Sequence, residues 1–335
     1  MNSATKIGYC LIAVTVLVLL PLLTFLGTGA EYAFAVVIPY CALTAFMAGF
    51  IYRIVRWAQS PVPFNITTVA GQEKSLPWIK DANIESPGNN WALAWRMFLE
   101  IFFFRSLFRN SRADMVAGQR LVYGGSRWLW LGGLAFHWSL LIIIFRHLRF
   151  FTEPVFLPVT WLTSLDSLFQ FSLSTLFLTD FIILAALTYL FLRRVVSPQI
   201  KYISLASDYL ALLLIMGVAI SGILMRWIFK VDVDAVKRLA ISMVTFRPAV
   251  GTDIGLAFYI HLMLVCTLLA YFPFSKMMHA PGILFSPTRN MKNDSRAIRH
   301  INPWDHPVRV HTYQEYEDEF RKPMIAAGLP VEKKE

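Results

Sequence analysis

Six apolar segments, each about as long as a bilayer-crossing helix, constrain the fold of this 335-residue chain more than any other feature. A transmembrane helix needs ~20 mainly apolar residues. The segments cover residues 7–30, 32–52, 128–150, 168–192, 209–225 and 254–275. Because 56% of the residues are hydrophobic and only 16% are charged, the chain cannot cover a soluble surface. The sequence therefore predicts an all-α integral membrane protein with six transmembrane helices.

The first segment has two interpretations. Lys6 precedes an apolar run that ends near Ala30, as in a cleaved signal peptide. This run is longer than the apolar core of a typical signal peptide, and a second span follows after one charged residue. We therefore expect a retained hairpin of two helices.

The basic residues predict the orientation of the spans. Of the 31 Lys and Arg residues, 24 lie at Lys6 and within residues 53–127, 193–201 and 276–335, which six spans place on one side. Cytoplasmic loops carry this excess, so both termini are expected in the cytoplasm of a bacterium or archaeon. The net charge of +10 thus indicates loops beside a lipid bilayer rather than a nucleic-acid-binding surface.

The spans divide the chain into four parts. We expect an N-terminal transmembrane hairpin (residues 1–53), a cytoplasmic loop (54–127), a four-helix domain (128–276) and a cytoplasmic tail (277–335). Within the loop, the aromatic-rich residues 91–109 are typical of an interfacial helix. The tail combines turn-rich stretches with a short charged helix near residues 313–321, too little to form a core, so it is expected to dock on a partner.

Four of the seven histidines form a pattern across two spans. His137 and His147 are ten residues apart on the third span, and His261 and His279 are eighteen apart along the sixth. These spans run in opposite directions, so His147 is expected to face His261 near the outer surface and His137 to face His279 near the inner one. Two facing imidazoles are the ligands of a six-coordinate b-type haem, and helix bundles hold such cofactors in their cores. Four unrelated interfacial histidines are the alternative.

The spacings test the haem interpretation. Ten residues of helix span ~15 Å and eighteen span ~27 Å, so the haems must tilt or the sixth helix must bend. Pro273 and Pro281 permit a break beside His279. The three cysteines, Cys10, Cys41 and Cys266, lie in apolar runs without C-x-x-C spacing, which excludes cysteine-ligated clusters and covalently attached haem. Residues 128–276 are thus predicted to be a dihaem cytochrome b domain.

Charged residues near these histidines are further candidates. Arg146, Arg149 and Arg226 on the outer side could pair with haem propionates, or they could simply anchor helix ends at the interface. Asp180 lies within the fourth span, where a carboxylate indicates proton transfer or a quinone contact. Its alternative is a helix shifted outward, with Asp180 near the interface or bonded to Thr179.

Seven sequence stretches show a resemblance to known proteins. They are residues 56–64 (RWAQSPVPF), 136–139 (FHWS), 146–154 (RHLRFFTEP), 258–261 (FYIH), 271–279 (YFPFSKMMH), 286–290 (SPTRN) and 313–318 (YQEYED). The histidine spacings resemble those of the dihaem gamma subunit of respiratory nitrate reductase. The whole chain resembles the DsrM family, the membrane cytochrome b subunits of the DsrMKJOP complexes of dissimilatory sulfur metabolism.

This resemblance implies two bis-histidine haems b and a site for menaquinone or another quinone near the outer haem. It also implies a DsrK-like cytoplasmic iron–sulfur subunit docked on the loop and tail, contact with the other DsrMKJOP subunits, and an indirect link to the small protein DsrC. Electron flow has either direction in this family, since sulfate reducers would oxidise quinol and sulfur oxidisers could run the route backwards.

A quinone site at the outer haem would need a proton acceptor. Glu153 is the acid nearest to His147 in the sequence and is the first candidate, with Asp180 second and Arg149 as the neighbouring cation. The alternative is a surface ion pair between Arg149 and Glu153 that contributes little. The rival class for the whole chain is a non-redox membrane anchor or a transporter subunit.

Overall fold

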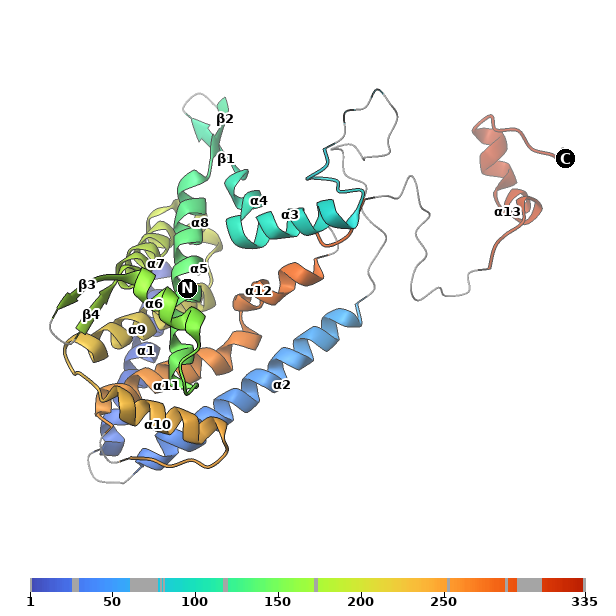
Figure 1. The fold of residues 1–335 in the computed structure, drawn as a ribbon. Helices are drawn as coiled ribbons and strands as arrows, with labels where there is room; N and C mark the ends of the chain where they lie inside the picture. Colours follow the sequence, from blue (N-terminus) through green and yellow to red (C-terminus); the bar gives the residue numbers. More distant parts are fainter. Residues whose placement is uncertain are drawn as a thin grey trace.

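The computed structural model describes residues 2–25, 30–60, 78, 80, 82–116, 120–171, 174–251, 254–286, 289–293 and 309–333. Helices dominate the molecule, with two small β-hairpins at its edges (Figure 1). Among the described helices, five stretches are long and apolar enough to cross a membrane: Ser3–Leu22, Ala33–Ala58, Arg127–Phe150, Ala206–Trp227 and Leu256–Phe274. The predicted all-α membrane fold is confirmed.

Six long helices form the body of the molecule. They are α1 (Ser3–Phe25), α2 (Ile38–Ala58, preceded by the π-helical turn η1, Ala33–Val37), α5 (Arg127–His147, followed by the 3-10 turn η2, Leu148–Phe150), α7 (Leu178–Val196), α9 (Ala206–Trp227) and α11 (Leu256–Tyr271). Helix α5 packs on α7, α7 on α9 and α9 on α11, while α2 packs on α11 and α1 covers both α9 and α11. Close approach of α5 and α7 depends on Gly132, where a Cβ atom would lie 2.6 Å from the Tyr189 ring.

Of the six predicted spans, the fourth is not among the five membrane-length stretches of the described helices. Residues 168–192 were expected to form one helix, but β3 (Ser167–Phe171) and β4 (Ser174–Phe177) pair as an antiparallel hairpin and α7 begins only at Leu178. Polar and apolar residues alternate from 169 to 174, and this period of two favours strands over helix. Asp180 therefore lies in the first turn of α7, where the helix dipole favours an acid, and not in the middle of a span.

The predicted interfacial helix is divided in two. Helix α3 (Asn90–Phe103) begins at Asn89, whose side chain accepts a hydrogen bond from the Ala92 N–H. Phe104 has a φ of 51°, and this left-handed residue turns the chain into the short helix α4 (Arg105–Phe108). The exposed Trp91, Trp95, Phe98 and Phe102 share one face of α3 because they are spaced by three or four residues.

Shorter elements lie at both ends of the long helices. They are β1 (Ser111–Val116) and β2 (Arg120–Gly125), α6 (Leu157–Asp166), α8 (Pro198–Ile203), α10 (Val233–Val244), the 3-10 turns η4 (Lys276–Met278) and η5 (Ile283–Phe285), α12 (His279–Gly282) and α13 (Tyr313–Ala326). Helix α13 starts where a tail helix was predicted, with Thr312 and Glu315 as its capping box, and continues to Ala326. The turn-rich stretches of the tail that contain His300, Trp304 and His306 lie outside the described residues.

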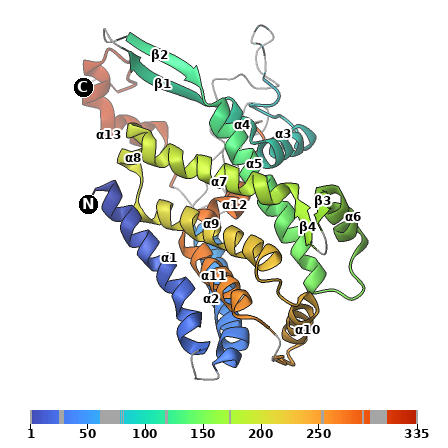
Figure 2. The same ribbon diagram turned by 90° about the vertical axis from the view of Figure 1, so that its left-hand side faces the viewer.

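The connections gather at two ends of the bundle (Figure 2). The N-terminus, α3, α4, the β1–β2 hairpin and α8 lie at one end, called here the α8 end. Helix α10 and the adjoining ends of α1 and α2 lie at the opposite end, the α10 end. The connections that carry most of the basic residues are thus grouped at the α8 end.

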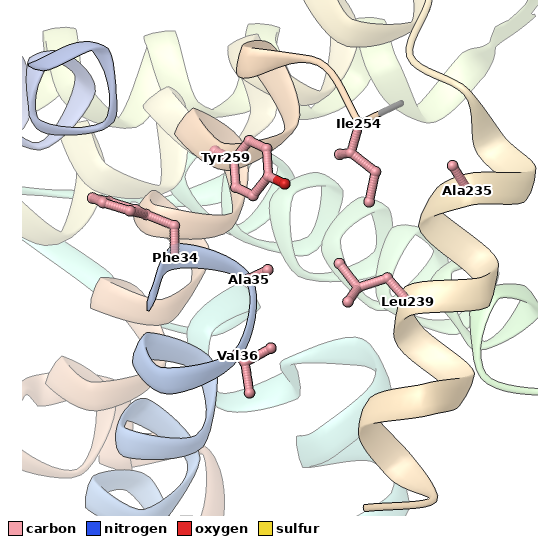
Figure 3. Close-up of a cluster of buried hydrophobic side chains, with 7 residues drawn as sticks. All are labelled: Phe34, Ala35, Val36, Ala235, Leu239, Ile254 and Tyr259. Atoms are coloured by element: carbon pink, nitrogen blue, oxygen red, sulfur yellow. The ribbon is translucent and has the colours of Figure 1, made fainter. Parts of the chain in front are cut away.

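Two buried clusters hold the body together. At the α10 end, Phe34, Ala35 and Val36 of η1 meet Ala235 and Leu239 of α10 and Ile254 and Tyr259 at the start of α11 (Figure 3). The second cluster joins Phe136 of α5, Ile183, Ala186 and Leu187 of α7 and Ile215 of α9. These contacts position α5, α9 and α11, which carry the candidate functional residues.

Candidate functional site

The four histidines of the sequence pattern lie on facing elements. His137 and His147 lie on α5, His261 lies near the start of α11, and His279 begins α12 after the helix break. The His137 and His279 ring centroids are 5.8 Å apart with an interplanar angle of 83°. His147 and His261 are close enough to interact electrostatically. The structure therefore brings together the same two pairs that the antiparallel spans predict.

The two pairs lie at different levels of the bundle. The 147–261 pair is toward the α10 end, because η2 follows His147 directly and packs on α10. The 137–279 pair depends on a broken helix: α11 stops at Tyr271, and the 3-10 turns η3 (Phe272–Phe274) and η4 lead to His279. Pro273 cannot continue the backbone ladder, which explains the break. The length of ~27 Å expected for continuous helix between His261 and His279 therefore does not apply, and the sixth helix breaks where Pro273 permits it.

Three of the four imidazoles donate a hydrogen bond to a backbone carbonyl. The Nδ1 atoms of His137, His147 and His279 lie 2.7, 2.7 and 2.9 Å from the carbonyl oxygens of Gly133, Ile143 and Lys276. A carbonyl oxygen only accepts, so each Nδ1 carries the proton. Each Nε2 therefore keeps a lone pair, which is the form of imidazole that binds a metal.

His261 reaches the same state through a side chain. Its Nδ1 lies 2.8 Å from the hydroxyl oxygen of Ser221 on α9. This hydroxyl donates its one proton to the Val218 carbonyl at 3.0 Å, so it accepts from the imidazole. The neighbouring Gly222 lies against the same ring, since a Cβ atom there would be 3.3 Å from the Cε1 of His261.

These donors fit haem iron rather than a protein-only metal cage. No group of three His, Cys, Asp or Glu side chains that could hold a metal ion is found in the described part of the chain. Two facing imidazoles with free Nε2 atoms complete the coordination of an iron that a porphyrin already holds in its plane. Helix α5 meets α12 through the 137–279 pair and α11 through the 147–261 pair. The principal packing partner of α5 is α7, and those of α11 are α9, α2 and α1.

Arg146 is held by a buried acid at the α10 end. It forms an ion pair with Asp166, the last residue of α6, and its Nη1 also donates to the Thr179 hydroxyl at 3.0 Å. Asp166 accepts from both the backbone N–H and the hydroxyl of Thr179, at 3.0 and 2.7 Å. Arg146 is only 3% exposed, and its Nε is buried without a partner among the described residues. This burial differs from that of an arginine anchored at the interface.

Asp180 forms a second ion pair beside the first. Its Oδ2 accepts from Arg226 of α9 at 2.6 Å. The guanidinium carbons of Arg146 and Arg226 lie 3.4 and 4.5 Å from the centroid of the Phe177 ring, so this ring lies against both cations. Asp180 is thus bonded to Arg226, whereas the Thr179 hydroxyl is bonded to Asp166.

Glu153 and Arg149 lie at the same end with different partners. Glu153 is exposed and forms an ion pair with Lys237 of α10 through Oε2. Arg149 lies over the Phe150 ring, with its guanidinium carbon 4.8 Å from the centroid, and within electrostatic range of Arg146 and Arg226. The surface pair considered between Arg149 and Glu153 is replaced in the structure by the contact of Glu153 with α10.

An acid of α9 supports the 137–279 pair. Asp208 is buried in the first turn of α9 and bonds Lys276 with its two oxygens at 2.8 and 3.0 Å. The Lys276 carbonyl in turn accepts from the imidazole of His279. The Asp208 side chain also accepts from the Leu205 N–H at 3.0 Å. Asp208 thus holds η4, which presents His279.

Sequence reasoning missed several of these residues. Asp166, Ser221, Gly222 and Asp208 were not among the candidates, although each contacts a candidate or supports one. Asp166 and Asp208 carried one usable signal, because an acid beside an apolar span usually has a partner. Ser221 carried none, since a serine within an apolar helix most often bonds its own backbone.

Comparisons with known proteins agree with this geometry. Residues 101–299 match the model of the nitrate reductase gamma subunit family. The chain is 46% identical over 305 residues to the Hdr-like menaquinol oxidoreductase cytochrome b-like subunit of Archaeoglobus fulgidus, covering 89% of this chain and 87% of that protein. It is 42% identical over 275 residues to the subunit of the same name from Archaeoglobus profundus, covering 80% and 81%.

The chain belongs to the nitrate reductase gamma subunit family. Membership and the apolar helices together define it as a multi-pass membrane protein with a helical cytochrome b fold.

Proposed function

We propose that this chain is a dihaem b-type membrane cytochrome that exchanges electrons between menaquinone, or another quinone, and a cytoplasmic iron–sulfur subunit. The names of the two relatives, Hdr-like menaquinol oxidoreductase cytochrome b-like subunits, support the quinone and the cytochrome. The resemblance to the DsrM family supports a role in dissimilatory sulfur metabolism, with a DsrK-like partner.

One observation carries the haem proposal. All four histidines have Nδ1 engaged as a donor and Nε2 left with its lone pair, and they face one another in two pairs. Unrelated interfacial histidines have no reason to share one tautomer and one pairwise arrangement. His147 and His261 would hold one haem and His137 and His279 the other, and the bound haems would pass electrons between the two ends of the bundle.

Arg146 is the proposed cation beside the 147–261 pair. Its Nη1 is occupied by Asp166 and Thr179, and its buried Nε is a donor left open for a propionate oxygen. Asp166 keeps the guanidinium in position whether or not a second anion is bound. Because Nη1 bonds to the protein and Nε does not, Arg146 can be held in place and still contact a ligand.

A quinone site at the α10 end is supported by three residues. A quinol that is oxidised gives up two protons and two electrons, so the site needs a proton acceptor open to water. Glu153 is our first candidate because it is exposed and only its Oε2 contacts Lys237. Asp180 is the second, and Arg149 would donate to a quinone oxygen.

The grouping of connections supports an orientation in the bacterial or archaeal cytoplasmic membrane. The α8 end carries most basic residues and would face the cytoplasm with both termini, which places the 147–261 pair outside. We propose that the chain has four functional parts. They are the N-terminal hairpin (1–53), the loop (54–127) with α3 against the lipid headgroups, the dihaem domain (128–276) and the tail (277–335). The loop and tail would dock the iron–sulfur partner.

A reduced-minus-oxidised optical spectrum of the purified chain, with haem quantified per chain, tests the proposal. We expect a b-type alpha band and two haems. A chain without this band would instead be a non-redox anchor or a transporter subunit. One haem per chain would contradict the paired arrangement while leaving a cytochrome.

A further inference from the structure

The four histidines differ in what accepts their Nδ1 proton. Three use a backbone carbonyl, whereas His261 is bonded at 2.8 Å to the hydroxyl of Ser221, a side chain from another helix, with the Val218 carbonyl of that helix also in contact. A substitution can remove a hydroxyl but cannot remove a carbonyl. We propose that Ser221 is a positioning residue that orients His261 and sets the reduction potential of one haem only, the one held by the 147–261 pair. This inference rests on the proposed haem function.

The position of Ser221 between two groups supports this role. Its hydroxyl accepts from His261 at 2.8 Å and donates to the Val218 carbonyl at 3.0 Å, which forms a relay from α11 into the backbone of α9. A serine that only bonded its own helix would need just the second of these bonds. The relay fixes the hydroxyl rotor with its lone pair toward the imidazole.

Gly222, on the same helix as Ser221, restricts the orientation of the His261 ring. Because a Cβ atom there would lie 3.3 Å from the His261 Cε1, α9 approaches the imidazole closely beside the hydrogen bond. The ring therefore meets α9 at two points, one polar and one steric. Together these contacts hold the imidazole plane, and the plane of an axial ligand affects the electronic structure of the iron.

The direction of the effect follows from the bond. A hydrogen bond accepted from Nδ1–H raises the basicity of the imidazole, and a more basic ligand stabilises ferric iron. Loss of the Ser221 hydroxyl leaves the imidazole with the Val218 carbonyl and weakens the hydrogen bond, which favours the ferrous state and raises the potential. The 137–279 haem should not respond, because both of its ligands donate to backbone carbonyls.

Redox titration of Ser221→Ala in the purified full chain tests the proposal, with the alpha band and low-temperature EPR as readouts. We expect two haems per chain, with a changed EPR signal for one of them. The reduction equilibrium of that haem should shift by up to tenfold, which raises its reduction potential by up to about 59 mV for one electron. Ser221→Thr keeps a hydroxyl and should restore the original value. Thr267→Val is the matched control, since it removes a hydroxyl of α11 that donates to the Met263 carbonyl and bonds no histidine among the described residues.

The possible outcomes distinguish failure of the proposed haem function from failure of the proposed role of Ser221. Absence of b-type haem in the unmodified chain would overturn the proposed function itself. Two haems with unchanged or lowered potentials in Ser221→Ala, or the same shift in Thr267→Val, would overturn only the role of Ser221. If Ser221→Ala fails to accumulate, Ser221→Thr and Ser221→Cys are compared instead. A haem potential in Ser221→Thr that matches the unmodified chain and differs from that in Ser221→Cys would support the role of Ser221. Identical potentials in Ser221→Thr and Ser221→Cys would contradict it.

Discussion

The two histidine pairs are built in different ways. At the 147–261 pair both ligands lie on regular helices, and the charged groups around them, Arg146 and Arg226, are paired with buried acids. At the 137–279 pair one ligand lies on α5 and the other follows a broken helix. One position thus depends on helix register, and the other depends on a side-chain contact between Asp208 and Lys276.

This difference teaches which residues each pair needs. Register is maintained by many backbone hydrogen bonds and by apolar packing, so a single substitution near the 147–261 pair should tune it without dismantling it. The η4 turn is three residues long, is capped by Ser275, which accepts from the Met277 N–H, and is tied to α9 by the bond between Lys276 and Asp208. A single substitution there should affect whether the ligand is presented at all.

Removal of a ligand should have the largest effect. We expect His147→Ala and His261→Ala to lose the same haem, and His137→Ala and His279→Ala to lose the other, because each iron needs both imidazoles of its pair. Haem content and EPR of the four variants provide the measurement. Loss of one and the same signal in His137→Ala and His147→Ala would refute the pairing of α5 with α11 and α12.

Asp208→Asn should have the next largest effect, and it should be confined to the 137–279 pair. The change removes the charge that holds Lys276 and should lower the free energy of unfolding by about 1–3 kcal/mol. Partial loss of one haem, with the other at full occupancy, is the expected optical and EPR result. Asp234→Asn, at an exposed acid in the first turn of α10, is the control and should leave both haems in place.

Glu153→Gln should act on kinetics at the other end. Removal of a proton acceptor slows a step by about 100-fold or more, so haem reduction by a quinol analogue should slow while haem content stays normal. Glu31→Gln changes another exposed acid and serves as the control. Unchanged reduction kinetics in stopped-flow measurements would exclude Glu153 and leave Asp180 as the candidate.

Acid should have the smallest effect, limited to the tail. The backbone N–H groups of Lys333 and Glu332 donate to Glu317 and hold the pKa of this carboxylate below its ordinary value of 4.5. Its contribution is therefore present above that value and is lost as the pH falls through the lower pKa of the folded state. We expect lower amide protection factors at these two residues at acidic pH, a change absent in Glu317→Gln, with both haem signals unchanged. Loss of haem in the same pH range would show that the tail and the haem pairs are coupled.

Much of the helical body could be predicted because it depends on local composition. The apolar lengths around α1, α2, α5, α9 and α11 are properties of the sequence alone, since each such segment must satisfy its backbone within itself in a bilayer. The start of α13 at Tyr313 was equally local, because Thr312 and Glu315 form a capping box. The β3–β4 hairpin was missed because total apolarity outweighed the alternation of residues 169 to 174.

What the sequence by itself determined is a membrane chain with four histidines at two levels of two antiparallel segments. Periodicity and hydropathy act along the chain, so they place His137, His147, His261 and His279 without further information. Only the tertiary structure decided that Arg146 meets Asp166, that Asp208 holds the turn before His279, and that Ser221 accepts from His261. These are contacts between elements 20 to 68 residues apart, and such contacts depend on how helices pack, which no local pattern of residues specifies.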